Sequence, residues 1–297
     1  MKNFNFPRVT LAQSTNRPVL DFVLPGLLAE SVGMIVGQSS IGKSYCALQL
    51  GLGVATGKPI AGGLWEAPAG GPTTIIMGED DPQILQERLY WLRQQEQLSD
   101  AEIEDADKYL RVYSGRGVDM RLLEKLPGAG FINGPFYPQL VKLCEMQRLV
   151  IIDPLLFLAG GLDENDNGAA AVLMSALYSI TKETGTTILL LHHVGKSNGE
   201  REEWAAARGA SALTTSVRWQ MNMSPPSKGE MEVFGIDEEM RKSWVRVSVV
   251  KANYGDAGAP VWLRRGKGGV LMKTDMFPSP RRKPEPQARK GGVREQV

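Results

Sequence analysis

The chain has 297 residues, of which 42% are hydrophobic and 23% are charged, a composition typical of a soluble globular protein. This length allows one large α/β domain or two small ones. The formal net charge of +1 excludes a global basic field that would attract nucleic acid, so any contact with DNA has to come from a local patch.

The first part of the chain shows no apolar signal core, and we expect residues 1–18 to form an N-terminal arm. The segment LDFVLPGLLAES then leads into a short buried strand, VGMIV, at 32–36. Residues 43–55 are apolar nearly all round, which predicts a helix buried in a core. The residues between this strand and this helix carry the strongest motif of the chain.

The middle of the chain alternates apolar runs with helical segments. A Gly/Pro-rich loop at 57–72 precedes these elements, and the segment 114–138 has no clear period. Continuous apolar runs of this kind predict a mainly parallel sheet that is covered by helices on both faces. The predicted strands are 73–77, 148–153 and 186–193, and the predicted helices are near 81–96 and at 170–184.

The rhythm changes after residue 214. In WVRVSVV, at 244–250, valines alternate with Trp244, Arg246 and Ser248, which predicts a strand with one buried face. TSVRWQM, VWLRR and GGVLM are further strand candidates, and we expect this whole set to extend the sheet as antiparallel strands. We therefore predict one domain over 19–276, followed by a basic tail at 277–297 with too few apolar residues to pack.

The stretch GQSSIGKS at 37–44 matches the G-x-x-x-x-G-K-S pattern of a phosphate-binding loop. Two glycines let the backbone turn tightly, so that consecutive N–H groups point inward at phosphate oxygens. The lysine reaches the β- and γ-phosphates, and the serine hydroxyl ligates Mg²⁺. A strand before the loop and a helix after it favour a site for ATP or another NTP with Mg²⁺ over a chance glycine-rich turn. The expected nucleotide contacts are Gly37, Gln38, Ser39, Ser40, Ile41, Gly42, Lys43, Ser44 and Tyr45.

A nucleotide hydrolase also needs a carboxylate for Mg²⁺ and a group that positions the attacking water. Asp153 closes a buried strand and is the candidate for Mg²⁺, but Pro154 rather than a glutamate follows it. Glu79 ends another strand and is the candidate for the water, because ligands in α/β sheets gather at the carboxyl ends of strands. The alternatives are a solvated loop acid for Glu79 and a helix cap for Asp153.

Both histidines of the chain, His192 and His193, end a third strand of this kind. A strand places neighbouring side chains on opposite faces, so one imidazole can face the nucleotide and hydrogen-bond the γ-phosphate. A satisfied core histidine is the alternative for either residue. A zinc site lacks the carboxylate or cysteine partners that it needs. The two cysteines, Cys46 and Cys144, have no metal-ligand spacing and are expected to be buried thiols in a reducing cytoplasm.

The order of GQSSIGKS, GED, IID and HH at successive strand ends, with hairpins after them, resembles the RecA-type ATPase core. More narrowly, the chain resembles the small RepA-type hexameric replicative helicases of broad-host-range plasmids, which are relatives of DnaB-like helicases. Like that family, we expect it to lack the primase-binding domain of larger DnaB-like proteins. The matching stretches within 19–272 are LDFVLPG, GKSYCALQL, GEDDP, LHHVGK, ARGAS, VRWQ, KANYG and GGVL.

The resemblance implies a homo-hexameric ring with ATP at each subunit interface. Lys43 and Ser44 would grip phosphate and Mg²⁺, and Asp153 would hold the metal. Glu79 would orient the water, and His193, the second of the pair, would sense the γ-phosphate. Arg208 in ARGAS matches an arginine that reaches into the neighbouring subunit's site. A surface arginine is the alternative.

Larger DnaB-like proteins carry a Lys-x-Arg-Asn-Gly-like motif on a late hairpin. Here KANYG keeps Lys251 but has Asn253 where the arginine would fall, which favours Arg208 as the finger and Lys251 as a helper. Arg88 or Tyr254 is the candidate for stacking on the adenine.

DNA contacts are expected on loops that follow the nucleotide-sensing strands. The loop at 194–206 follows the γ-phosphate sensor, and its candidates for holding a phosphate backbone are Lys196, Ser197, Asn198 and Arg201. The segment 158–168 is a second candidate, although its acidity argues against direct phosphate contact. Ordinary solvated loops are the alternative for both.

These features together predict a ring-forming ATP-dependent DNA helicase that moves on single-stranded DNA, 5′ to 3′ as the resembled family does. A replication initiator or a primase is the further partner class to expect. Two alternatives remain: a RecA-type regulatory ATPase that switches partner proteins, and a recombinase-like ATPase that coats DNA as a filament.

Overall fold

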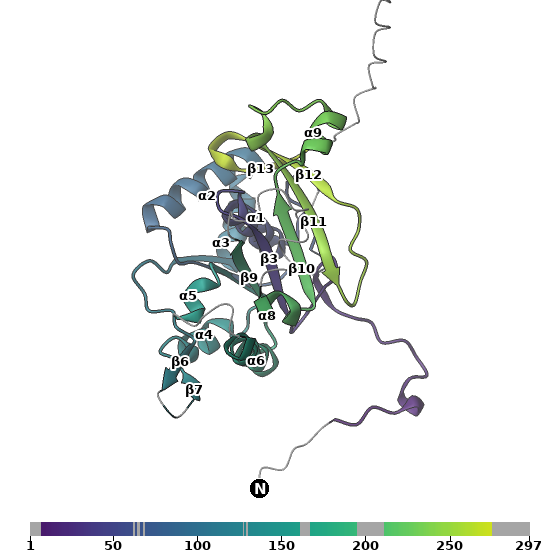
Figure 1. Cartoon of the computed structure of the whole chain (residues 1–297), viewed down its shortest axis with the longest axis vertical. Helices are drawn as coiled ribbons and strands as arrows, with labels where there is room; N and C mark the ends of the chain where they lie inside the picture. Colours follow the sequence, from purple (N-terminus) through teal and green to yellow (C-terminus); the bar gives the residue numbers. More distant parts are fainter. Residues whose placement is uncertain are drawn as a thin grey trace, which may run out of the picture.

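The computed structural model describes residues 7–61, 63, 66–67, 69–126, 128, 130–160, 167–194 and 211–274. Within these residues, nine strands form one central sheet in the order β13-β12-β11-β10-β3-β9-β8-β4-β5 (Figure 1). The parallel strands are β3 (Val32–Gln38), β4 (Thr73–Met77), β5 (Leu110–Ser114), β8 (Leu149–Asp153), β9 (Thr187–Val194) and β10 (Trp219–Ser224). The antiparallel strands are β11 (Trp244–Ala252), β12 (Val261–Arg265) and β13 (Leu271–Lys273).

Helices cover both faces of this sheet and bury two separate clusters of side chains. One face carries α1 (Lys43–Thr56), α2 (Pro82–Glu96) and α3 (Asp100–Tyr109) (Figure 1). The other carries α4 (Tyr137–Cys144), α5 (Leu156–Ala159), α6 (Asn167–Thr184) and α8 (Ser211–Ser216). The predicted mainly parallel α/β sheet with helices on both faces is confirmed.

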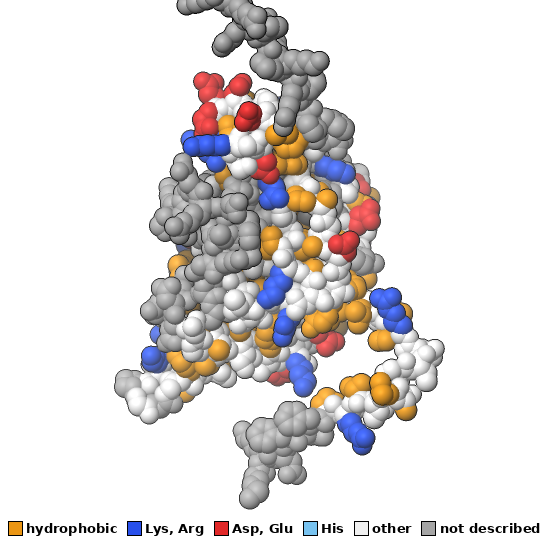
Figure 2. Space-filling view, turned by 45° about the vertical axis from the view of Figure 1, so that its right-hand side comes forward, with side chains coloured by type: hydrophobic (Ala, Val, Ile, Leu, Met, Phe, Trp, Pro, Cys, Tyr) orange, Lys and Arg blue, Asp and Glu red, His pale blue; other side chains and the backbone are white. Residues whose placement is uncertain are grey.

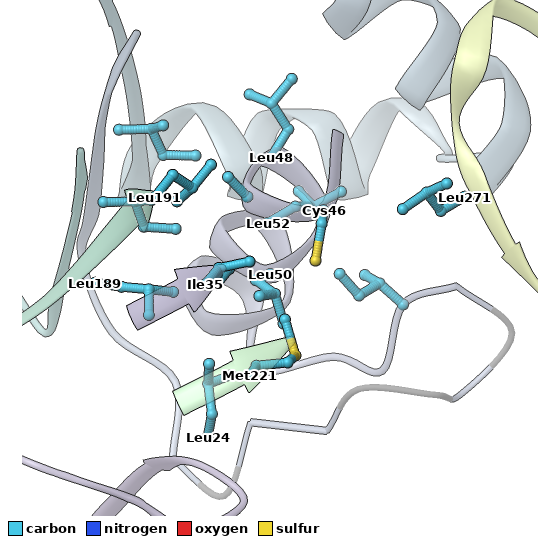
Figure 3. Close-up of a cluster of buried hydrophobic side chains, with 14 of the residues drawn as sticks. Leu24, Ile35, Cys46, Leu48, Leu50, Leu52, Leu189, Leu191, Met221 and Leu271 are labelled. Atoms are coloured by element: carbon cyan, nitrogen blue, oxygen red, sulfur yellow. The ribbon is translucent and has the colours of Figure 1, made fainter. Parts of the chain in front are cut away.

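The continuous apolar runs have a direct explanation in this arrangement. Ile151 packs in the cluster under α1, whereas its neighbours Val150 and Ile152 pack in the cluster under α6. Figure 3 shows Ile35, Leu189 and Leu191 meeting the side chains of α1 in the first cluster. Both faces of these strands are buried, so apolar residues follow one another along them without alternation.

The structure corrects two details of the C-terminal strands. The strand expected at TSVRWQM begins only at Trp219, because the residues up to Ser216 form α8. This strand, β10, is also parallel to β3 and not antiparallel to the sheet. The chain reverses only after β10, through α9 (Lys228–Phe234) and the 3-10 turn η3 (Arg241–Ser243), so the antiparallel extension starts at β11.

Smaller elements complete the description. A hairpin of β6 (Leu123–Leu126) and β7 (Gly130–Asn133) lies in the segment that showed no clear period. The pair β1 (Phe22–Leu24) and β2 (Leu27–Leu28) precedes β3, and the turn η4 (Lys267–Gly269) joins β12 to β13. Cys46 and Cys144 are buried and free. No helix in the described part of the chain is long and apolar enough to cross a membrane.

The described part of the N-terminal arm, residues 7–20, stands away from the body (Figures 1 and 2). It contains one 3-10 turn, η1 (Leu11–Gln13), and exposes Val9, Leu11 and Val19 almost completely. An ion pair between Asp21 and Arg148, with Arg148 Nη2 2.6 Å from Asp21 Oδ1, fixes the point where the arm leaves the body.

Candidate nucleotide-binding site

The predicted site residues of four strands lie at one edge of the sheet. Gly37 of β3 pairs with His193 of β9, and Met77 of β4 pairs with Asp153 of β8. Glu79 follows Met77 after one residue. The carboxyl ends of parallel strands meet at this edge, which is where α/β proteins bind their ligands.

The loop between β3 and α1 has the backbone of a phosphate-binding turn. Gly42 has a φ of 105°, in the left-handed region that glycine tolerates. A Cβ on Gly37 would come within 2.7 Å of the Met223 carbonyl oxygen of β10, so only glycine fits there. The loop therefore opens at the N-terminus of a long helix, whose free N–H groups and dipole favour an anion.

Lys43 is buried and folds back across this loop. Its Nζ donates to the carbonyl oxygens of Gly37 at 2.8 Å and Gln38 at 3.0 Å, and lies 3.1 Å from Nδ1 of His193. Burial lowers the pKa of Lys43 to about 8, although the carboxylates of Asp153 and Glu79 act in the opposite direction. An ammonium held in a cradle of oxygen acceptors is able to exchange those acceptors for phosphate oxygens.

Ser44 and Asp153 form a pair of oxygen ligands next to Lys43. Ser44 Oγ donates to Asp153 Oδ2 at 2.6 Å. Asp153 is only 6% exposed, and burial raises the pKa of its carboxyl, against the effects of Ser44 and Lys43. A hydroxyl and a desolvated carboxylate are the hard oxygen donors that Mg²⁺ prefers, so these two residues fit the metal.

Glu79 is exposed and lies just beyond β4. The N–H of Gly78, its neighbour, donates to the Asp153 carbonyl oxygen at 2.6 Å, which ties the two strand ends together. The Glu79 carboxylate acts electrostatically on Lys43, Asp153 and His193. It also lines a cavity of about 700 Å³ beside the site, so water has access to it.

The two histidines occupy different environments, as the strand predicted. His192 is 4% exposed, and burial lowers its pKa to about 4, so it is neutral at physiological pH. His193 faces the loop, where Nδ1 lies 3.1 Å from Lys43 Nζ. Burial and the charge of Lys43 lower the pKa of His193 as well. When Nδ1 accepts from Lys43, the proton sits on Nε2, and this buried atom has no hydrogen-bond partner among the described residues.

Arg88 lies beside the first turn of α1. Its guanidinium is 5.6 Å from the centre of the Tyr45 ring and 3.0 Å from Asp80. Tyr45 directly follows Ser44, so Arg88 borders the loop on the side of α2.

Lys251 and Tyr254 are not brought to this site. Lys251 pairs with Gln220 at the beginning of β10, whereas the phosphate loop lies at the end of β10, where Met223 pairs with Gly37. Lys251 Nζ donates to the Thr215 carbonyl oxygen at 2.8 Å, and Tyr254 is exposed. The remaining predicted residues, Lys196, Ser197, Asn198, Arg201 and Arg208, lie outside the described residues.

One contact with the loop was not predicted from the sequence. Arg265, at the end of β12, donates a hydrogen bond from Nη2 to the carbonyl oxygen of Ser40. The two residues are 225 positions apart, and no motif relates them. Only the glycines that follow Arg265 indicated a tight turn here.

Fold and site together define a P-loop ATPase of the RecA-like class. The family model of an AAA domain, AAA_25, matches residues 2–199, and the chain belongs to this family. Solved structures share the fold at low identity. The ATPase domain of a helicase is 12% identical, with a TM-score of 0.55, over 83% of this chain and 85% of that one.

Two further structures give similar values. The RadB recombinase is 12% identical, with a TM-score of 0.51, over 85% of this chain and 93% of that one. A KaiC-like protein from Pyrococcus horikoshii OT3 is 13% identical, with a TM-score of 0.52, over 86% of this chain and 98% of that one. These likenesses establish the RecA-like fold.

Proposed function

We propose that this protein is an ATP-driven, ring-forming DNA helicase of the RepA type, which translocates on single-stranded DNA during plasmid or phage-type replication. The observation that carries the ATPase part is the convergence of Lys43, the Ser44–Asp153 pair and His193 at one sheet edge. The DNA part rests on the resemblance of the stretches ARGAS, VRWQ, KANYG and GGVL to that helicase family.

The residues of the chain divide the hydrolysis of ATP to ADP and phosphate among them. Lys43 and the N–H groups of the loop hold the β- and γ-phosphates. Ser44 and Asp153 would hold Mg²⁺, which supplies positive charge against the phosphate oxygens. Glu79 orients the water that attacks the γ-phosphorus while the bond to the bridging oxygen of ADP breaks.

His193 is suited to report on the γ-phosphate. Its buried Nε2 lacks a partner among the described residues, and a donor in that position costs free energy until an acceptor arrives. The γ-phosphate supplies such an acceptor, and its release removes it. The strand that carries His193 continues into the loop proposed to hold DNA, so the two events are mechanically linked.

A shared site between subunits is supported by the position of Lys251. This residue lies at the opposite edge from its own phosphate loop, where Arg218 also acts electrostatically on it. A basic side chain in that place cannot reach its own nucleotide but is available to a neighbouring copy. Arg208, which comes shortly before α8 in the sequence, is the proposed finger.

The first experiment measures ATP hydrolysis by the wild type with and without single-stranded DNA. A helicase motor shows strong stimulation by DNA. A rate that does not respond to DNA would contradict the proposal and favour a regulatory ATPase.

A mixing experiment tests the shared site. Arg208→Ala and Lys43→Ala are each expected to be inactive alone. Mixed subunits should regain part of the activity, because an intact loop then meets an intact arginine across an interface. No recovery in mixed assemblies of confirmed composition would exclude a finger supplied by the neighbour.

A recombinase-like ATPase is the second candidate, favoured by the fold shared with the RadB recombinase over 85% of this chain. It would coat single-stranded DNA as an open filament. Electron microscopy of the protein with DNA and ATP distinguishes closed rings from filaments.

A further inference from the structure

Arg265 bridges three parts of the molecule that are distant in sequence. It is the last residue of β12, and its Nη2 donates to the Ser40 carbonyl oxygen of the phosphate loop. Its Nε donates to the carbonyl oxygen of Lys242 at 3.0 Å, in the turn η3 that precedes β11. Burial lowers the pKa of Arg265, but a guanidinium stays protonated in a protein, so a desolvated positive charge lies directly behind the loop.

The contact falls at the point where the loop is most strained. Ser40 has a φ of 63°, a value that a non-glycine residue rarely adopts. In a phosphate-binding loop the N–H groups turn inward, so carbonyl oxygens turn outward and need a donor of their own. The guanidinium supplies that donor to Ser40 and thereby favours the conformation with inward N–H groups.

The same edge strands back the loop at a second point. A Cβ on Gly42 would lie 3.3 Å from Leu271 Cδ2 and 3.5 Å from Arg265 Nη1, so these two side chains form the outer wall of the loop. Leu271 is itself fixed to α1, because its N–H donates to Gln49 Oε1 at 3.1 Å and its carbonyl accepts from Gln49 Nε2 at 2.7 Å. The position of Arg265 relative to the loop is therefore set by rigid elements.

We propose that Arg265 is a positioning residue of the nucleotide site, which holds the Ser40 carbonyl outward so that the following N–H groups face the β-phosphate. This inference deepens the proposed function and rests on it. The fork of the guanidinium bridges Ser40 and Lys242 at once, which a lysine ammonium cannot do with the same geometry.

The decisive variants are Arg265→Gln and Arg265→Lys, with Arg264→Gln as the matched control. Arg264 is exposed, and its guanidinium lies 5.6 Å from the centre of the Trp244 ring, away from the loop. Loss of one charged hydrogen bond that orders a binding loop predicts a dissociation constant about tenfold weaker. The loss should be equal for ADP and for a non-hydrolysable ATP analogue, because the loop cradles the β-phosphate that both carry.

The experiment combines calorimetric titration of Mg-ADP and the Mg-analogue with steady-state kinetics and thermal unfolding without nucleotide. We expect Arg265→Gln to raise KM and both dissociation constants about tenfold, with kcat at saturation nearly unchanged. Arg265→Lys should fall between Arg265→Gln and the wild type, and Arg264→Gln should match the wild type.

Three results would overturn the proposal. Equal binding by Arg265→Gln and Arg264→Gln would show that the contact does not order the loop. A lower kcat with unchanged dissociation constants would place Arg265 in the transition state instead. Wild-type binding by Arg265→Lys would show that charge alone suffices, and this variant decides the matter if Arg265→Gln does not fold.

Failure of the proposed function has a different signature. A wild type that does not bind Mg-ADP, or a Lys43→Ala variant that binds it equally well, would remove the nucleotide site itself. A negative result for Arg265→Gln beside normal wild-type binding removes only the positioning role.

Discussion

The parallel strands β3, β4, β8 and β9 and the antiparallel strands β11 to β13 belong to one sheet but contribute differently to the site. The parallel strands are buried on both faces and end in the chemical groups, such as Asp153 and His193. The antiparallel strands carry no such group in the part of the chain that the structure describes, and instead brace the loop from outside, through Arg265 and Leu271. The comparison teaches that the chemistry and the support of this site come from different ends of the sequence.

The parallel half is tested most severely at Glu79. Glu79→Gln keeps the size of the side chain but removes the charge that orients water, so kcat should fall roughly 10² to 10⁴-fold. Nucleotide affinity should stay unchanged, since Lys43 and Ser44 are intact. Steady-state ATPase assays and ADP titration measure the two quantities.

The control for Glu79 is Asp81→Asn. Asp81 is a nearby acid whose pairing with Arg116 is largely exposed, and its loss should leave kcat within about twofold. Equal losses in the two variants would mean that Glu79 has no special role and would remove the distinction between strand-end chemistry and loop surface.

The bracing half is tested at Gln49, which is completely buried in α1. Gln49 Nε2 also donates to Glu96 Oε1 at 2.8 Å, and Glu96 accepts from the N–H of Ala61. Gln49→Met should lower the free energy of unfolding by about 2–4 kcal/mol, because buried groups of Leu271 and Glu96 lose their partner.

Urea unfolding of Gln49→Met against Gln86→Met measures this effect, since Gln86 is an exposed residue of α2. We expect Gln86→Met to lie within about 0.5 kcal/mol of the wild type. If the two variants were equally stable, the link between β13 and the loop helix would contribute nothing, and the bracing half would reduce to Arg265.

How much of this comparison is visible in the sequence differs between the two halves. Strands with both faces buried are uninterrupted apolar runs, so β4 was predicted from TTIIM and β8 from LVIID. Once these strands are parallel, their carboxyl ends meet at one edge. The approach of Glu79 and Asp153 to Lys43 therefore follows from local sequence and topology alone.

The other half is not predictable in the same way. The direction of β10 is not encoded in TSVRWQM, because an apolar pattern is the same for parallel and antiparallel pairing. The edge strand β5 and the β6–β7 hairpin are partly exposed and carry weak patterns. The contact of Arg265 with Ser40 depends on tertiary packing between distant segments, which no spacing rule describes.

The smallest expected effect concerns the charge of Lys43. Its pKa of about 8 lies below the ordinary value of 10.5, so between these two pH values the unfolded chain binds more protons and stability rises with pH. Nucleotide binding needs the charged form, so ADP affinity should fall about tenfold between pH 7 and 9, with proton uptake on binding near pH 8 to 9.

Calorimetry in buffers of different ionisation enthalpy measures this proton uptake. Lys43→Arg is the control, because its guanidinium stays charged over this range and the uptake should vanish. Uptake that persists unchanged in Lys43→Arg would assign the proton to another group and separate the depressed pKa from the function of the loop.

The central claim, that hydrolysis at this sheet edge drives movement along DNA, is tested most directly by strand displacement. A forked duplex with single-stranded tails is mixed with the wild type or Lys43→Ala, in the presence of ATP or a non-hydrolysable analogue. We predict that only the wild type with ATP separates the strands. Hydrolysis that is stimulated by single-stranded DNA but separates no strands, on forks with a tail of either polarity, would contradict the account.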